Sequence, residues 1–425
     1  MVMKGKTTIV LLSAVFSVWL LSCEKEKFDK EIYDGFVDYQ FMVDSVDRSH
    51  NWMLTQSGSI MITLPDNVST VQLLTGNPYI TQDVEIVAES SLQSGENRQM
   101  TLGYVVPIQV NTLYVAAITS NGSYLGVMPF PVGTESLVLS EDDFTGGGSP
   151  LALSHQSFSY LYEADFPYPG DFDYNDMVLR IKKRPGPEPQ IIDLDVTLEA
   201  AGTPTAYAAA IQLADISHKD IEKVEIVKGL VMDQNYPLAP HYISSNDVLM
   251  KGKGGQAVIR LFENVQWVFS KTLNDMGTID ALRYNTSHTD TKGYSAAADA
   301  VSATYRITFK EATKARHFTF ENIDPFIIHT YNGGNWEVHT YAHKFDEVLW
   351  RVYNDNQHLF DNHVSWSLVI PKGDFRYSLE GIGLCSFNNN TGERFGPYES
   401  FSYWMQDHNN YQDWYLHVTK EQLLF

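Results

Sequence analysis

Alternation of apolar and polar residues predicts β-strands along most of this chain. In residues 192–199 every second residue is Ile, Leu or Val, and the residues between them are Asp, Thr or Glu. Residues 301–309 and 366–370 show the same period, which places one face of a strand in a core and the other in water. Helical periodicity is scarce, and residues 215–224 fit a short helix best. The pattern therefore predicts an all-β protein.

The N-terminal part consists of short apolar runs separated by turn residues. Residues 59–64 and 71–74 are two such runs, and each is followed by a turn that contains Pro. Residues 113–119 and 124–128 flank Ser120-Asn121-Gly122, and an Asn-Gly pair between two strands is typical of a β-hairpin. Strands this short predict a small β-sandwich over residues 28–145.

Residues 141–150 predict a link between two domains. They are acidic at first and continue with three glycines, a serine and a proline, a composition that packs little. The strand patterns beyond the link predict a larger all-β domain over residues 150–425, with a sandwich-like or jelly-roll-like architecture.

The N-terminus predicts export and lipid anchoring. Lys4 and Lys6 precede an apolar stretch over residues 9–21, which is too short to span a membrane but has the length of a signal-peptide core. The stretch ends in Leu20-Leu21-Ser22-Cys23, which resembles a bacterial lipobox. We expect a signal peptide over residues 1–22, a lipid on Cys23 and a tether over residues 23–27. An ordinary signal peptide with an incidental cysteine is the alternative.

The composition of the chain limits the classes of ligand that it can bind and the number of disulfides that it can form. The formal net charge of -22 is the opposite of the basic footprint that nucleic acids require, and it suits a cation as ligand. The chain has two cysteines. If one of them carries the lipid, only Cys385 remains, and no intrachain disulfide forms.

The densest group of candidate ligands lies in Asp171-Phe172-Asp173-Tyr174-Asn175-Asp176. Asp171, Asp173 and Asn175 have the spacing of positions 1, 3 and 5 of an EF-hand loop, whereas position 6 is Asp176 instead of Gly, and position 12 is Lys182 instead of Glu,. The remaining ligands must therefore come from elsewhere.

Upstream acids are the nearest source of further ligands, Glu163 first and Asp165 second. Oxygen ligands packed this densely predict a Ca²⁺ site on a β scaffold. The predicted ligands are Asp171, Asp173, Asn175, Asp176 and Glu163. The alternative is an Asx-rich turn whose side chains cap backbone N–H groups.

Residues 158–178 resemble the signature of the LruC-type domain lipoproteins of Bacteroides-like bacteria and spirochaetes. Glu163, Pro167 and Gly170 match that signature together with most of residues 171–176, while Ala164 replaces an Asp. Residues 198–202, 258–264 and 322–327 are similar to later parts of that domain. The resemblance covers residues 150–425 and implies a β-rich lipoprotein domain with a Ca²⁺ site and no assigned molecular function.

Two other groups of residues suit either a functional or a structural role. His329, Glu337, His339 and His343 lie close in sequence, but structural zinc sites usually include Cys, so structural or surface histidines are the preferred interpretation. Near the C-terminus, aromatic residues alternate with Asp and Asn, which suits either core packing or a sugar-binding surface. The candidate surface residues are Tyr403, Trp404 and Trp414.

These observations predict a lipid-anchored protein of the cell envelope, placed at the outer membrane, that binds Ca²⁺ and acts as a surface binding or adhesion module. Its expected partners are the membrane, through the anchor, and a glycan or an extracellular protein, with no nucleic acid. The sequence has no Gly-x-Ser-x-Gly or His-Glu-x-x-His motif, so no enzyme is predicted. A glycan-active enzyme and a purely structural envelope lipoprotein are the alternatives.

Overall fold

The computed structural model describes most of the chain from residue 46 onward. The described residues are 46–92, 97–147, 149–164, 170–229, 236–238, 240–243, 245–279, 283–285, 296–352, 364–387 and 394–425. The predicted signal peptide (1–22), the tether (23–27) and Cys23 lie outside them. Strands dominate the described residues, which confirms the all-β prediction. No helix among these residues is long and apolar enough to cross a membrane.

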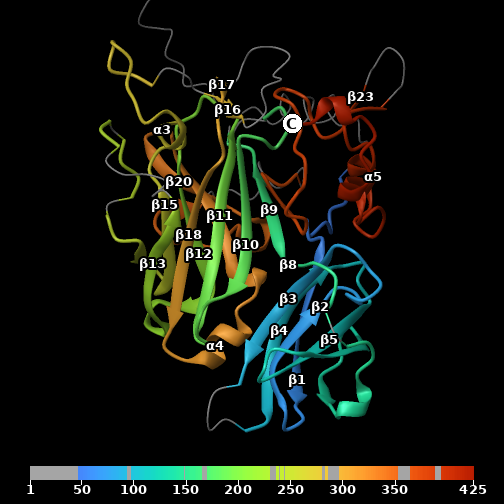
Figure 1. The fold of residues 1–425 in the computed structure, drawn as a ribbon. Coiled ribbons are helices and arrows are strands. Elements are labelled where there is room, and N and C mark those ends of the chain that lie inside the picture. Colours follow the sequence, from blue (N-terminus) through green and yellow to red (C-terminus); the bar gives the residue numbers. More distant parts are fainter. Residues whose placement is uncertain are drawn as a thin grey trace, which may run out of the picture.

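Two sheets form a smaller sandwich at the N-terminal side (Figure 1). One has the order β4-β1-β7 and the other β6-β5-β2-β3-β8. Their strands are β1 (Thr55–Thr63), β2 (Val68–Leu74), β3 (Val84–Ser91), β4 (Gln99–Pro107), β5 (Thr112–Thr119), β6 (Tyr124–Pro131), β7 (Ser136–Val138) and β8 (Leu153–His155). Aliphatic side chains such as Ile60, Val71 and Leu102 fill the space between the sheets. The predicted hairpin is confirmed as the antiparallel pair β5 and β6.

The predicted link folds back onto the smaller sandwich before the chain leaves it. Thr145 bridges to Val127, and β8, which follows the link, pairs in parallel with β3. The chain changes sheet between His155 and Ser157, a few residues beyond the predicted limits at 145 and 150. Those domain limits stay predictions.

The larger sandwich contains an eight-stranded and a six-stranded sheet. The first has the order β13-β18-β11-β10-β9-β22, with β16 and β17 beside β11, and the second has the order β14-β15-β12-β19-β20-β21. The strands of the first sheet are β9 (Ser157–Tyr162), β10 (Met177–Pro185), β11 (Ile191–Ala201), β13 (Ile221–Gly229), β16 (Tyr284–Asn285), β17 (Ala296–Ala297), β18 (Val301–Phe309) and β22 (Ser367–Ile370). Those of the second are β12 (Ala208–Ser217), β14 (Leu249–Lys251), β15 (Gln256–Phe262), β19 (Ile323–Tyr331), β20 (Gly334–His339) and β21 (Arg351–Val352).

The helices that the structure describes are short and lie between strands or near the C-terminus. The α-helices among them are α3 (Val265–Ser270), α4 (Ala312–His317) and α5 (Ser400–Gln406). The 3₁₀ turns are η1 (Glu141–Asp143), η2 (His218–Asp220), η3 (Phe320–Asn322), η4 (Tyr341–His343), η5 (Trp414–Leu416) and η6 (Glu421–Leu423), and a further two-stranded sheet pairs β23 (Ser386–Phe387) with β24 (Arg394–Phe395).

The helix predicted for residues 215–224 is wrong. Strand β12 continues to Ser217, a single 3₁₀ turn follows, and β13 begins at Ile221. Asp215 lies in the left-handed region with φ 61°, where the pairing of β12 with β15 changes register. Pairing of β13 with β18 therefore outweighs the weak local preference for a helix.

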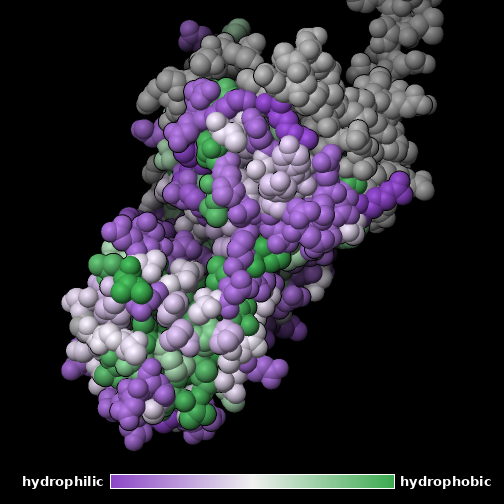
Figure 2. All heavy atoms as spheres, turned by 90° about the vertical axis from the view of Figure 1, so that its right-hand side faces the viewer, coloured by the Kyte–Doolittle hydropathy of each residue, from purple (hydrophilic) through white to green (hydrophobic). Residues whose placement is uncertain are grey.

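The two sandwiches meet along a mixed apolar and polar interface. Arg316 of α4 donates from Nε to Ser90 Oγ (2.9 Å) and from Nη2 to the Ser91 carbonyl (3.0 Å). Trp52 and Leu54, which lead into β1, are buried in the core of the larger sandwich. Figure 2 shows hydrophobic atoms at this junction, below a largely hydrophilic face of the larger sandwich.

Candidate metal centre

The acidic motif lies at one end of the eight-stranded sheet, in the connection between β9 and β10. These strands are antiparallel neighbours, and Tyr162 is paired with Met177. Glu163, which follows β9, and Asp176, which precedes β10, are thereby brought to the same end of the sheet. The Ala164 N–H donates to Asp176 Oδ2 at 2.5 Å, which closes the base of the loop.

Three of the predicted ligands converge. Glu163, Asp171 and Asp173 each place one carboxylate oxygen within 4.8 Å of the others. Oxygen ligands lie about 2.3–2.6 Å from a Ca²⁺ ion, so two ligands of the same ion are at most about 5 Å apart. Glu163 and Asp173 are buried and Asp171 is half-buried. The group therefore has the oxygen donors and the spacing of a cation site that remains open toward solvent on one side.

Two left-handed residues give the loop its shape. Phe172 and Tyr174 have φ 57° and 54°, an uncommon conformation for bulky residues. Both rings are buried, at 1% and 0% exposure, and the Tyr174 hydroxyl donates to the Ser365 carbonyl at 2.7 Å. Both rings belong to the core of the larger sandwich. Their burial fixes the backbone on either side of Asp173.

Two glycines make room for the polar side chains of the site. A Cβ atom at Gly170 would lie 1.8 Å from Glu163 Oε2, and one at Gly202 would lie 1.7 Å from Asn175 Oδ1. Neither distance is compatible with an undisturbed site, so a side chain at either position would displace the polar group that faces it. Gly202 follows β11, and its N–H donates to the Asn175 carbonyl at 3.0 Å.

The charges that act most on Asp173 are negative. The pKa of Asp173 lies well above its ordinary value. Burial is the largest cause, and the negative charges of Asp171, Glu163, Glu380 and Asp176 raise the pKa further. Such an environment favours either a proton on one of the acids or a bound cation among them. A cation that neutralises this group would lower the electrostatic cost of burying Asp173.

A distant C-terminal segment completes the site. The Gly381 N–H donates to Asp173 Oδ2 at 2.8 Å, and the Asn175 amide donates to the Ser378 carbonyl at 3.2 Å. The Leu384 N–H donates to the Phe172 carbonyl at 3.0 Å. Sequence reasoning missed this segment, because Glu380 is the single acid in residues 378–384 and about 200 residues separate the segment from the loop.

The other two predicted ligands differ in their surroundings. Asp176 Oδ2 accepts the Ala164 N–H, whereas Asn175 Oδ1 is buried and has no hydrogen-bond partner among the described residues. Asp176 does not belong to the converging acids, and the assignment of these two residues as ligands stays a prediction. Asp165, the second upstream candidate, lies outside the described residues.

Among the described residues, the histidines considered for zinc do not converge on one point. His339 Nδ1 contacts Asp324 Oδ2 at 2.6 Å, and its Nε2 contacts Glu337 Oε2 at 3.4 Å, with all three side chains buried. Burial lowers the pKa of His339, but Asp324 and Glu337 outweigh this effect and raise the pKa to about 9. A protonated imidazole between two carboxylates is an ion pair and not a metal ligand.

The predicted aromatic ligand surface needs correction. Trp404 and Trp414 are fully buried, at 0% exposure, so both rings pack in the core. Tyr403 is 39% exposed, but Tyr411 stacks on it with ring centroids 5.1 Å apart, and the Arg394 guanidinium carbon lies 4.2 Å from its centroid. Neither tryptophan therefore presents a ring to a ligand.

Residues 190–415 match a protein family described as a domain of unknown function, DUF4842. The match covers more than half of the chain, so the chain belongs to this family. The acidic loop precedes the matched segment and packs against residues within it. The LruC-type resemblance is not confirmed by this match. No curated protein matches the chain.

Two solved structures are similar to the chain at low identity. A candidate lipoprotein from Bacteroides ovatus has a TM-score of 0.47 and 12% identity, over 84% of this chain and 99% of that chain. The full-length major pilin SpaD from Corynebacterium diphtheriae has a TM-score of 0.16 and 12% identity, over 67% of this chain and 66% of that chain. At these scores neither likeness bears on function.

Proposed function

We propose that this chain is a lipid-anchored protein of the cell envelope whose larger sandwich binds Ca²⁺ and acts as a binding or adhesion module. The observation that supports the metal site is the convergence of Glu163, Asp171 and Asp173 within 4.8 Å. Three carboxylates would supply at least three of the six to eight oxygens that Ca²⁺ takes, and backbone carbonyls and water would supply the rest.

The donor set favours calcium over a transition metal. Zinc prefers Cys and His ligands, whereas Glu163, Asp171 and Asp173 offer carboxylates alone. Carboxylate and water ligands suit the hard cations Ca²⁺ and Mg²⁺, and Ca²⁺ tolerates irregular geometry better than Mg²⁺.

The bound ion would hold together parts of the chain that are far apart in sequence. The end of β9, the acidic loop and residues 378–384 all meet at Asp173 or its neighbours. A metal that binds the folded loop and not the unfolded chain stabilises the fold by mass action. We therefore assign the ion a role in rigidifying the module, whose proposed partner is a glycan or an extracellular protein.

Thermal unfolding with and without calcium tests the metal site. At a calcium concentration of about 100 Kd, the free energy of unfolding should rise by about 2.7 kcal/mol relative to chelator-treated protein. Asp173→Asn should abolish this increment, while Asp142→Asn, which alters an exposed acid in the smaller sandwich, should retain it. Superimposable melts of the wild-type protein in calcium and in chelator would contradict the proposal.

The lipid anchor is a separate part of the proposal and rests on residues 4–23. Two acyl chains bind a membrane firmly through their buried methylene groups. Cys23→Ser should therefore release the protein from the membrane fraction or leave its signal peptide uncleaved, as judged by fractionation and intact mass. Full membrane retention of the processed variant would exclude the lipobox.

A further inference from the structure

A pocket of about 250 Å³ lies where the two sandwiches meet, apart from the candidate metal centre. The smaller sandwich and the segment leading into it contribute Trp52, Leu54 and Val105 to the lining, and the larger sandwich contributes Tyr160, Phe320 and Tyr341. Pockets between domains with aromatic walls and a few polar groups are common ligand sites. This volume is below the roughly 300–1,000 Å³ of drug-sized sites, so a single-ring ligand fits it.

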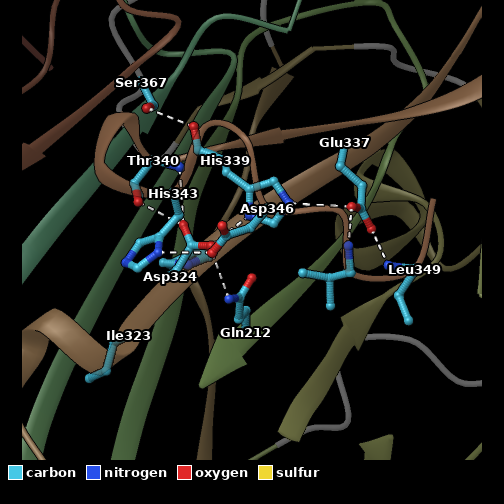
Figure 3. Close-up of polar contacts among 12 residues, drawn as sticks. Gln212, Ile323, Asp324, Glu337, His339, Thr340, His343, Asp346, Leu349 and Ser367 are labelled. Atoms are coloured by element: carbon cyan, nitrogen blue, oxygen red, sulfur yellow. Dashed lines mark hydrogen bonds and ion pairs between the residues drawn. The ribbon is translucent and has the colours of Figure 1, made fainter. Parts of the chain in front are cut away.

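The polar part of the lining is held in place by the network in Figure 3. Thr340 Oγ1 donates to Asp324 Oδ1 at 2.7 Å, and Ser367 Oγ donates to the His339 carbonyl at 3.1 Å. The hydroxyl hydrogens of Thr340 and Ser367 are thus already used, and their oxygens remain as acceptors. This part of the wall therefore favours a ligand that donates hydrogen bonds.

His343 adds an imidazole to the lining. Its Nδ1 lies 3.1 Å from Asp346 Oδ2, and Asp346 also accepts from the Gln212 amide at 2.9 Å. The contact with Asp346 thereby fixes the ring of His343 beside the pocket.

The charges of the lining are negative. Asp215 and Glu321 are both exposed and both line the pocket, and its described lining contains no lysine or arginine. Aromatic faces also attract cations. The Lys344 ammonium already lies 3.2 Å from the centroid of Tyr341, so one ring of the lining stabilises a cation within the protein itself.

We propose that this pocket binds a small organic cation with one flat apolar ring, of the protonated arylalkylamine class. The ring would pack against Met53, Tyr341 and Val369, three apolar lining residues that are not fully buried, and the ammonium group would face Asp215 and Glu321. Asp215 has a left-handed backbone, which Asn tolerates, so its charge can be removed without disturbing the turn.

Three probes of similar size and different charge test the proposal on the full-length chain. These are 2-phenylethylamine, 2-phenylethanol and phenylacetate, titrated at pH 7 by calorimetry and by tryptophan fluorescence. The amine should bind with a Kd of roughly 0.1–5 mM, as expected for a ligand of so few atoms. The alcohol should bind several-fold more weakly, and phenylacetate should bind more weakly still.

Variants of the rim and of the wall locate the binding site. Asp215→Asn and Glu321→Gln should each weaken amine binding by about two- to fivefold, the range for exposed charges, and leave the alcohol unaffected. Ala342→Trp, which adds a large side chain at an exposed lining position, should abolish binding of both. Glu141→Gln, an exposed acid of the smaller sandwich, is the matched control and should change nothing.

Two results would overturn the proposal. One is binding of phenylacetate as tight as that of the amine. The other is no saturable signal for the amine up to about ten times the weakest expected Kd, from a wild-type protein with an ordinary thermal melt. Amine binding that Ala342→Trp and the rim variants leave unchanged would place the ligand elsewhere and would also refute it.

Discussion

Two groups of buried carboxylates in the larger sandwich have opposite electrostatic surroundings. Asp324 and Glu337 flank His339 at 2.6 and 3.4 Å, and its raised pKa of about 9 keeps the imidazole protonated at neutral pH. Asp173 is surrounded mainly by other acids, which raise its own pKa. In the first group a side chain of the protein, His339, supplies the positive charge. The second group would need a proton or a cation from solution to neutralise it.

Asp193 is another buried acid that follows the first pattern. Asp193 on β11 is fully buried, although its place in the alternation predicted that it would face water. Arg184 on β10 and Arg306 on β18 approach its Oδ2 at 2.9 and 2.8 Å. Because β10 and β18 are the two neighbours of β11, the sheet itself supplies the cations. The acidic loop lies beyond the strand ends, and the charges that act most on Asp173 include no cation.

Removal of the internal cation should have the largest effect. His339→Gln leaves Asp324 and Glu337 buried without the imidazolium, and loss of one partner of a buried ion pair costs about 3–5 kcal/mol. Chemical denaturation should show this loss with and without calcium. His417→Gln, which removes an exposed histidine contact to Asp413, should cost less than about 1 kcal/mol. Equal, small losses in both variants would mean that the buried charge on His339 is not needed.

Gly170→Ala should have an intermediate effect that depends on calcium. The new Cβ atom would lie 1.8 Å from Glu163 Oε2, so the carboxylate must move away from Asp171 and Asp173. We expect a loss of about 1–3 kcal/mol from overpacking and calcium binding weakened by about tenfold or more. Gly254→Ala, which meets the flexible end of the Gln256 side chain, serves as control. Unchanged calcium affinity in Gly170→Ala would show that Glu163 is not a ligand of the metal.

Much of the fold follows from local patterns, and the exceptions have physical reasons. The alternation in residues 192–199 and 301–309 and the Asn121-Gly122 turn predicted β11, β18 and the β5–β6 hairpin, because strand period and turn geometry are local properties. The helix predicted for residues 215–224 is wrong because a register shift in β12 and the pairing of β13 decide the structure there. Neither is visible in a short window of sequence.

The candidate site likewise combines local features, which the sequence predicts, with distant contacts, which it does not predict. The spacing of Asp171 and Asp173 is local, and the structure brings both together with Glu163. The contribution of Gly381 is not local, because it depends on how the C-terminal segment returns to the loop. Trp404 and Trp414 were candidates for a ligand surface as well as for the core, because aromatic residues beside Asp and Asn occur both on sugar-binding faces and at core edges. Their burial depends on packing that sequence does not reveal.

The smallest predicted effect is a pH dependence specific to the group around His339. The folded pKa of about 9 exceeds the ordinary value of about 6.5, so the stabilisation is fully present below about pH 6.5 and is lost as the pH rises through about 9. The stability difference between wild type and His339→Gln should therefore shrink by roughly 1 kcal/mol between pH 6 and pH 7.5. The difference between the two proteins is the quantity to measure, because other buried groups titrate in both. Burial raises the pKa of Glu85 to about 7 and lowers the pKa of Lys183 to about 8, so the stability of both proteins falls through Glu85 up to about pH 7 and rises through Lys183 above about pH 8. A difference that stays constant from pH 6 to pH 9 would show that His339 is neutral in the folded protein, and the contrast with the acidic loop would disappear.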